Sequence, residues 1–470
     1  MVTEPSWCRE EFERRQKEFL AEWAEAVRFP TVGADPNHWE DCQACASWYA
    51  DRLRARGFTA EVLPTGDRTP PIVLAERPGR SDRPTLLIYG HYDVQPADSL
   101  EKWKTPPFEP VWREGRLWGR GAQDNKGQLA YLLAALAAMH HRAPNALPPL
   151  RLLLEGQEES GSSGLARCLP GLAERIRADA LLVCDTFMSP DGAPALVMGL
   201  RGIVHFTLTV FGPRRDLHSG THGGVAPNPA IGLCRMVAAL HRPDGAPAVP
   251  GFEPPPDCPS AREQELLART PFDPAEYERQ TGVPPVGGER ALPPLVRLGF
   301  RPTIEVNGIL SGYTGAGSKT IIPERAMAKI SARLAAGQDP ERCLALLEQF
   351  LRDHTPAGLR CEITEQTIGG PALRLDPDSP WAAAAARALE AVCGRSVVYQ
   401  WEGASIPILA ALSRAAGGAA PILTGFGREE DAVHAPNESF ALDRFRLGFR
   451  FVCSFITNFG GFYDTLASPS

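Results

Sequence analysis

Short, mostly apolar runs alternate with helical patterns over the first 200 residues, and this alternation restricts the fold more than any other feature. Three such runs are TLLIYG at 85–90, LRLLL at 150–154 and ALLVC at 180–184. Runs of this kind are typical of strands that are buried on both faces of a parallel sheet. A long apolar helix is predicted between the first two, over Gly127–His141. The order predicts an α/β fold with a mostly parallel, doubly wound sheet.

A different pattern begins near residue 201. The segment Gly202–Phe211 alternates apolar and polar side chains, as half-buried strands do. The sequence then predicts a helix, two strands, a helix and a strand, over 228–241, 303–310, 325–334, 339–354 and 359–367. The order β-α-β-β-α-β is that of a ferredoxin-like α+β domain. A loop-rich, proline-rich segment at 242–302 separates its first helix from its second strand.

The α/β pattern resumes after residue 373. It contains the apolar runs VVYQW at 397–401 and ILTGF at 422–426, a helix predicted from about residue 405, and a long final helix predicted from Ser439. We therefore expect one α/β domain in two parts, 1–200 and 374–470, interrupted by an inserted α+β domain at 201–373.

Charge and composition exclude several classes of partner. The 49 Lys and Arg stand against 56 Asp and Glu without a long basic run, so a nucleic-acid partner is not expected. The first residues lack the apolar core of a secretory signal, and the longest apolar stretch, Leu129–Met139, is about half of what a membrane span needs. The 11 cysteines are odd in number and scattered, which predicts reduced thiols. We expect a cytoplasmic protein with no membrane partner.

Acidic and histidine side chains lie at or just after four of the predicted strand ends and helix starts. They are His91 and Asp93, Asp124, Glu158 and Glu159, and Asp185. Each group alone has an ordinary explanation: a hydrogen-bonded core pair, a helix N-cap, a solvated surface or a turn. Open α/β sheets bind their ligands at the carboxyl ends of the strands, and four such groups together favour a metal site there. Imidazole and carboxylate ligands suit zinc best, with manganese or cobalt as alternatives.

Six segments resemble one family in their sequence. They are GHYDVQPADSLEKWKTPPFEP at 90–110, LWGRGAQDNKGQ at 117–128, EGQEESGSSG at 155–164, DLHSG at 216–220, GSKTIIPERAMAKISARL at 317–334 and GREEDAVHAPNES at 427–439. The chain thereby resembles the dinuclear zinc metallopeptidases, which include carnosinase-type dipeptidases, carboxypeptidase G, and acetylornithine or succinyl-diaminopimelate deacylases. The VQP run and the long inserted domain favour the dipeptidase branch. The family's catalytic domain with an inserted lid matches the interrupted organisation predicted above.

The resemblance implies a set of five ligands for two Zn²⁺ ions. His91 and Asp185 would hold one ion, Glu159 and His434 the other, and Asp124 would bridge the two. Three carboxylates and one hydroxide would balance the charge of two Zn²⁺ ions, which suits a buried site.

The resemblance also assigns catalytic roles. Glu158 would be the general base, taking a proton from the attacking water and passing it to the leaving nitrogen. Asp93 would brace His91. His218, in the inserted domain, would stabilise the oxyanion across the interface of a homodimer formed through that domain.

For the substrate, the resemblance implies an anion site for a free carboxylate. Its residues would be Arg333, Thr320, and the turn that contains Gly403 and Ser405, which is predicted to open a helix. Ile368 stands where carnosinase-type members often carry a histidine, which leaves the exact substrate open.

We therefore expect a zinc-dependent dipeptidase acting on a small peptide. One alternative is a deacylase of N-acyl amino acids on the same fold, and a more distant one is a non-catalytic zinc-binding protein.

Overall fold

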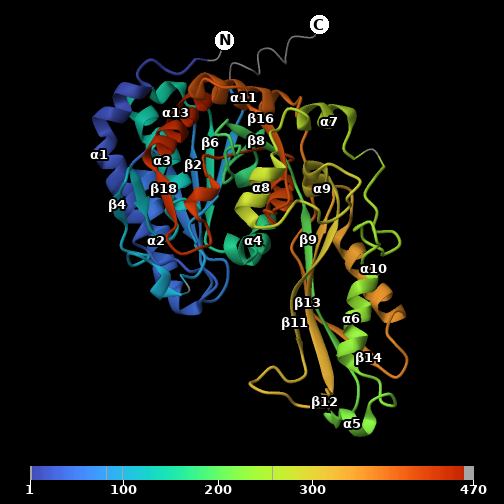
Figure 1. Cartoon of the computed structure of the whole chain (residues 1–470). Coiled ribbons are helices and arrows are strands. Elements are labelled where there is room, and N and C mark those ends of the chain that lie inside the picture. Colours follow the sequence, from blue (N-terminus) through green and yellow to red (C-terminus); the bar gives the residue numbers. More distant parts are fainter. Residues whose placement is uncertain (1–2, 81, 98, 257, 460–470) are drawn as a thin grey trace.

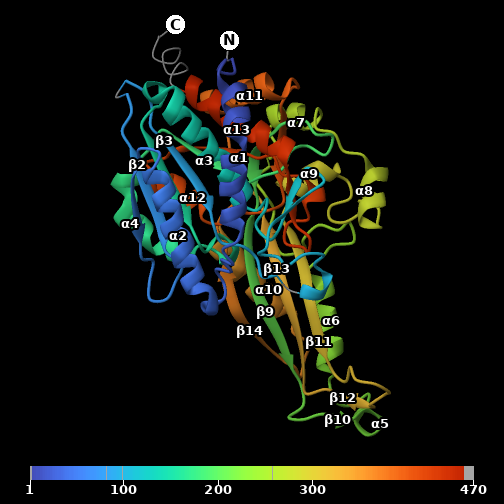
Figure 2. The ribbon, with the colours of Figure 1, turned by 90° about the vertical axis from the view of Figure 1, so that its left-hand side faces the viewer.

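The computed structural model describes residues 3–80, 82–97, 99–256 and 258–459. It consists of a broad α/β domain and a long arm that extends away from it (Figures 1 and 2).

The α/β domain is built on a nine-stranded sheet in the order β1-β2-β6-β3-β7-β17-β8-β15, with β16 also paired to β8. Its strands are β1 (Thr59–Leu63), β2 (Ile72–Arg77), β3 (Leu86–His91), β6 (Leu150–Glu155), β7 (Ala180–Cys184), β8 (Ala195–Leu200), β15 (Leu373–Arg374), β16 (Val398–Glu402) and β17 (Ala420–Thr424). The central strands β6, β3, β7 and β17 run parallel to one another, whereas β1, β2 and β15 pair antiparallel. The predicted mostly parallel sheet is confirmed at its centre.

Helices cover both faces of this sheet, which confirms the doubly wound arrangement. The first face carries α1 (Cys8–Val27), α2 (Trp39–Arg54), α3 (Lys126–Arg142), α11 (Pro380–Cys393) and α13 (Leu442–Asn458), and the second carries α4 (Ser163–Ile176) and α12 (Leu409–Ala415). Along β3, Leu86 and Ile88 face the first layer of helices, whereas Leu87 and Tyr89 face the second. Both faces are therefore apolar, as the unbroken runs in the sequence predicted.

The arm contains the ferredoxin-like unit. Its elements are β9 (Gly202–Phe211), α6 (Pro229–Ala239), β11 (Thr303–Ser311), β13 (Arg325–Leu334), α10 (Pro340–Asp353) and β14 (Arg360–Ile368). The sheet has the antiparallel order β11-β13-β9-β14. Alternate residues of β9, from Val204 to Val210, pack beneath α6 and α10 in a separate core. The predicted ferredoxin-like insertion is confirmed, and the residue boundaries of the three segments stay a prediction.

The arm ends in a small tip, seen at the bottom of Figure 1. The tip consists of β10 (Leu217–His218), α5 (Ser219–His222) and β12 (Ile321–Ile322), with β10 paired to β12. At the other end of the arm, the segment 242–302 forms α7 (Ala261–Leu267), α8 (Pro274–Thr281) and α9 (Pro294–Phe300), and both α7 and α9 contact β16.

Two predicted helix starts are wrong. The helix expected from about residue 405 begins at Leu409, because Ile406 precedes Pro407 and the residue before a proline is disfavoured in the helical region. The final helix begins at Leu442 rather than Ser439. Residues Ser439–Ala441 instead form β18, which pairs with β5 (Arg116–Trp118); β5 also pairs with β4 (Val111–Arg113). Pairing with a segment more than 300 residues away overrides the local helical pattern.

Candidate metal centre

The predicted ligands come from the carboxyl ends of neighbouring strands. The order β6-β3-β7-β17 places four such ends side by side. His91 is the last residue of β3, Asp185 follows β7, Glu159 lies in a single 3-10 turn after β6, His434 follows β17, and Asp124 lies just before α3. Parallel strands end at the same edge of a sheet, so residues distant in sequence meet there.

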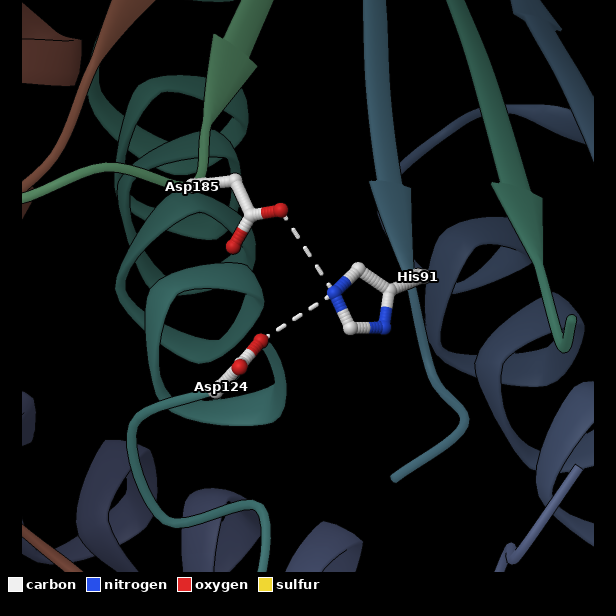
Figure 3. A group of neighbouring side chains, drawn as sticks. All are labelled: His91, Asp124 and Asp185. Atoms are coloured by element: carbon white, nitrogen blue, oxygen red, sulfur yellow. Dashed lines mark ion pairs between the residues drawn. The ribbon is translucent and has the colours of Figure 1, made fainter. Parts of the chain in front are cut away.

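The first cluster contains His91, Asp124 and Asp185 (Figure 3). His91 Nε2 lies 3.2 Å from Asp124 Oδ1 and 3.5 Å from Asp185 Oδ2. The second cluster contains Asp124, Glu159 and His434. His434 Nε2 lies 3.0 Å from Asp124 Oδ2 and 3.2 Å from Glu159 Oε2. Asp124 thus presents one carboxylate oxygen to each cluster, as a bridging ligand does.

The pKa values show an excess of negative charge in both clusters. Burial opposes a charged imidazole, yet Asp185 and Asp124 raise the pKa of His91 well above its usual value. Contacts with Asp124 and Glu159 raise the pKa of His434 to about 10. Burial, and then the charges of Asp124 and Glu159, raise the pKa of Asp185 to about 6, although His91 acts in the opposite direction. Groups that attract protons so strongly would attract divalent cations in the same way.

The residues fit two metal ions by their chemistry as well. Each cluster offers imidazole nitrogen and carboxylate oxygen, the donors preferred by zinc and also suited to manganese or cobalt. Glu159 Oε1 is buried and has no hydrogen-bond partner within the described part of the chain, so it is free to act as a ligand.

Asp93 links the two clusters. Its carboxylate lies 3.3 Å from His91 Nδ1, and its two oxygens accept the backbone N–H groups of Glu158 and Glu159 at 3.2 and 3.1 Å. Asp93 is completely buried. It therefore orients the imidazole of His91 and the turn that carries the second cluster's glutamate at the same time.

Two further supporting residues were not identified from the sequence. Asn125 Nδ2 donates to Asp185 Oδ1 at 2.7 Å and to the carbonyl of Cys184 at 2.8 Å, which fixes the orientation of Asp185. The carboxylate of Glu438 accepts the backbone N–H groups of Gly121, Gln123 and Asp124, and so fixes the loop before α3. No local signal distinguishes Glu438 from an ordinary acidic loop residue.

Glu158 lies beside both clusters. Burial raises its pKa well above the usual value, and the carboxylates of Asp185, Glu159 and Asp93 raise it further, although His91 opposes them. A carboxylate with a raised pKa is suited to accept a proton near neutral pH and to give it up again.

Glu402, at the end of β16, is another residue that the sequence did not single out. Burial, and then the charge of Asp185, raise its pKa to about 7. Among the described residues its carboxylate has no ion-pair or hydrogen-bond partner. It is thus an acidic group, close to Asp185, that remains available to a ligand.

The predicted anion site is partly assembled. Arg333 on β13 donates from Nη1 to Ser405 Oγ at 2.9 Å, so the arm and the turn after β16 meet at this point. Gly403 belongs to the same turn. The helix expected to open from this turn begins only at Leu409, so the anion would be bound by side chains and the turn rather than by a helix N-terminus.

His218 and Thr320 lie elsewhere. The backbone N–H of Ser219 donates to the carbonyl of Thr320 at 3.0 Å, and His218 pairs with Ile321, so the two predicted residues meet at the tip of the arm. Both are exposed. Figure 1 shows this tip at the end of the arm farthest from the α/β domain, and therefore away from the two clusters.

A doubly wound α/β domain with an inserted ferredoxin-like arm, and with two histidine–carboxylate clusters that share one aspartate, defines a class of metal-dependent hydrolases. Residues 87–458 match the family model described as peptidase family M20/M25/M40, and the chain belongs to this family of metallopeptidases. Among the described residues, no helix is both long and apolar enough to cross a membrane.

Nearly the full length of the chain is similar to two dipeptidases and a metallo-carboxypeptidase. It is 28% identical to the Cys-Gly metallodipeptidase dug1 of Schizosaccharomyces pombe, over 95% of this chain and 96% of that protein. The crystal structure of human carnosine dipeptidase 1 matches with a TM-score of 0.82 and 25% identity, covering 97% of this chain and 99% of that one. A metallo-carboxypeptidase from Sulfolobus solfataricus matches with a TM-score of 0.82 and 26% identity, covering 94% and 99%.

Proposed function

We propose that this protein is a dinuclear zinc dipeptidase that hydrolyses the amide bond of a dipeptide with a free amine and a free C-terminal carboxylate. The observation that carries the proposal is the pair of clusters that share Asp124, with Glu158 beside them. Two divalent cations held by these residues would supply the positive charge that activates water and polarises the scissile carbonyl. His91 and Asp185 would hold one ion, Glu159 and His434 the other.

The protein's own side chains account for proton transfer. Glu158 takes the proton of the attacking water and delivers it to the nitrogen of the leaving amino acid. Its raised pKa suits both steps. Asp93 holds His91 and the Glu158–Glu159 turn in fixed positions. The carboxylate of Glu158 therefore does not have to reorient before it accepts the proton.

Both a dipeptide and an N-acyl amino acid carry a C-terminal carboxylate, and only a dipeptide also carries a free amine, so the group proposed to bind the amine is what favours a dipeptide. Arg333, Ser405 and the turn at Gly403 offer a site for the C-terminal carboxylate. Thr320, the remaining member of the predicted set, lies at the tip of the arm and would join this site only from the partner subunit. The half-buried carboxylate of Glu402 would bind a protonated amine, whereas a neutral acyl group would cover it without giving it a partner. The deacylase thus remains the second candidate on the same fold.

Dimerisation through the arm is part of the proposal. His218 and Thr320 lie at the tip of the arm, away from the clusters of their own chain. The neighbouring edge strand β11 exposes Ile309 and Leu310 by 58% and 56%. A homodimer that covers this edge would bring His218 to the active site of the partner subunit, where its imidazole would stabilise the oxyanion.

A turnover assay by mass spectrometry tests the function. The zinc-loaded protein is incubated with a panel of dipeptides and the matching N-acyl amino acids, with and without a chelator, and metal content is measured on the same sample. Chelator-sensitive cleavage of free-amine dipeptides is expected. Cleavage of the acylated compounds alone would replace the proposal with the deacylase, and two bound metals without turnover would leave a non-catalytic zinc protein. The same assay on protein loaded with Mn²⁺ or Co²⁺ shows which metal supports the highest turnover.

We also propose a cytoplasmic location. All 11 cysteines are free in the structure, and most of them are buried, as is usual for proteins of a reducing compartment.

A further inference from the structure

Arg201 is a buried arginine whose charge is not balanced by a carboxylate in the described part of the chain. It lies between β8 and β9, where the α/β domain meets the arm, and its exposed fraction is 9%. Nε donates to the carbonyl of Gly403 at 3.2 Å, and Nη1 donates to the carbonyl of Arg301 at 3.3 Å and to Thr303 Oγ1 at 3.4 Å. All three acceptors are neutral. Buried charges in proteins are ordinarily paired, so this guanidinium is an unusual group.

A second arginine lies beside it. Arg333 donates to Ser405 Oγ, and Ser405 Oγ donates in turn to the carbonyl of Arg201 at 2.6 Å. Burial and the charge of Arg333 lower the pKa of Arg201 to about 10, and the same two causes lower the pKa of His205 on β9. Glu305 on β11 acts on Arg201 in the opposite direction, but it is exposed and forms no ion pair with it. These two arginines therefore carry a positive charge that an anion would neutralise.

The free nitrogen of Arg201 is directed at the turn that carries Ser405. Nη2 has no hydrogen-bond acceptor among the described residues. A Cβ atom on Gly403 would lie 2.6 Å from Arg201 Nη2 and 2.9 Å from Leu298 Cδ1. Leu298, on α9, is 47% exposed. A free donor and an exposed apolar side chain thus flank the same residue of the turn, two positions before the serine that contacts Arg333.

We propose that Arg201 Nη2 binds a second carboxylate, carried by the side chain of the substrate's C-terminal residue, with the methylene groups of that side chain against Leu298. Dipeptides that end in Asp or Glu are then the preferred substrates. The inference rests on the proposed dipeptidase function, in which Arg333 binds the main-chain carboxylate. Arg201 is a specificity-determining residue in this scheme, and the inserted segment 242–302 contributes one wall of the site through α9.

Matched substrate pairs test this inference. Ala-Glu against Ala-Gln, and Ala-Asp against Ala-Asn, differ by one charge at nearly constant shape. We expect the wild-type protein to hydrolyse the acidic member with a kcat/KM about 10–100 times higher, as for one charge-assisted hydrogen bond in a buried site. In Arg201→Met the acid-to-amide ratio should fall to about 1, because the guanidinium is the group that distinguishes the two. The control Leu298→Ala removes the apolar wall of the same site, and its acid-to-amide ratio should stay at the wild-type value.

The outcomes separate the inference from the function on which it rests. A wild-type ratio near 1 overturns the inference without any variant, and therefore does not depend on whether Arg201→Met folds. An equal loss of kcat/KM on both members of a pair in Arg201→Met also overturns it, because Arg201 would then serve the turn or the main-chain carboxylate. Failure of the metal-loaded wild type to cleave any dipeptide refutes the proposed function instead.

Discussion

A substitution of Glu438 tests how the loop that carries Asp124, the aspartate shared by the two clusters, is stabilised. Its Oε2 accepts hydrogen bonds from Arg120 Nη1 at 2.9 Å and from the backbone N–H of Gly121 at 2.8 Å. Its Oε1 accepts from the N–H groups of Gln123 at 2.9 Å and Asp124 at 3.1 Å. The side chains of Glu438 and Arg120 are 1% and 3% exposed. The substitution to make is Glu438→Gln, which keeps the shape of the side chain.

The expected loss follows from these contacts. The side-chain amide of the new glutamine can take two orientations, and in each of them its NH₂ group faces two of the donors that the carboxylate accepted from. Two hydrogen bonds to a charged acceptor are therefore lost, and Arg120 loses its counter-ion. Each such bond contributes about 1.5–3 kcal/mol, so the free energy of unfolding should fall by about 3–6 kcal/mol. Burial raises the pKa of Glu438, although Arg120 lowers it, which favours the lower end of this range. Because the loop holds Asp124, metal affinity should also fall by about 10–100-fold.

Chemical denaturation of the metal-free protein measures the first effect, and competition with a chelator of known affinity measures the second. Glu429→Gln is the matched control, since Glu429 is an exposed residue of the segment after β17 and should change neither quantity. A Glu438→Gln protein with wild-type unfolding free energy and metal affinity would show that the loop holds its shape without this carboxylate, and the argument would fail.

Three further predictions concern catalysis, pH and assembly. Glu158→Gln should lower kcat by about 10²–10⁴ while metal content stays unchanged, because the ligands are intact; loss of metal instead would make Glu158 a ligand. Burial raises the pKa of Glu155 to about 7, so the metal-free wild type should lose stability relative to Glu155→Gln as pH rises from about 4.5 to about 7, by up to about 3 kcal/mol, measured by denaturation across that range. Stability falls because Glu155 stays protonated in the folded protein over this pH range, whereas it is ionised in the unfolded chain. A stability that rises with pH would contradict the raised pKa of Glu155. Mixing inactive Glu158→Gln and His218→Ala chains should restore about one quarter of wild-type activity, since half of the random dimers are mixed and one of their two sites is complete; no recovery, or a monomeric mass in light scattering, would contradict the dimer.

The elements that could be predicted from the sequence are those with a strong local pattern. The strands β3, β6 and β7 were found within one residue because runs buried on both faces differ clearly from loops. Once these strands are adjacent and parallel, the side chains at their ends meet, and this explains how His91 and Asp185 could be brought together from sequence.

The residues that could not be predicted act through contacts between distant segments. Glu438 fixes a loop more than 300 residues earlier, and Ser439 pairs with Trp118 instead of starting a helix. The hydrogen bond between Asn125 and Asp185 could not be predicted, because only the folded chain shows that the two side chains lie within reach of each other. Local patterns carry no information about such partners, so supporting residues are harder to predict than the ligands they support.

The two ends of the proposed substrate site lie in one short turn, and this restricts the length of the substrate. Glu402, proposed for the amine, and Ser405, proposed with Arg333 for the carboxylate, are three residues apart, a span of at most about 10 Å even when fully extended. A dipeptide can reach both ends at once. A tripeptide bound through its C-terminal carboxylate would carry its amine beyond Glu402, which would cover the carboxylate of Glu402 without giving it a partner. We therefore expect Ala-Ala-Ala to be cleaved with a kcat/KM at least about tenfold below that of Ala-Ala, and the difference to shrink in Glu402→Gln, because the discrimination depends on the charge of Glu402. Equal kcat/KM values for the two peptides would show that the turn does not restrict the length of the substrate, and would favour a carboxypeptidase that accepts longer chains.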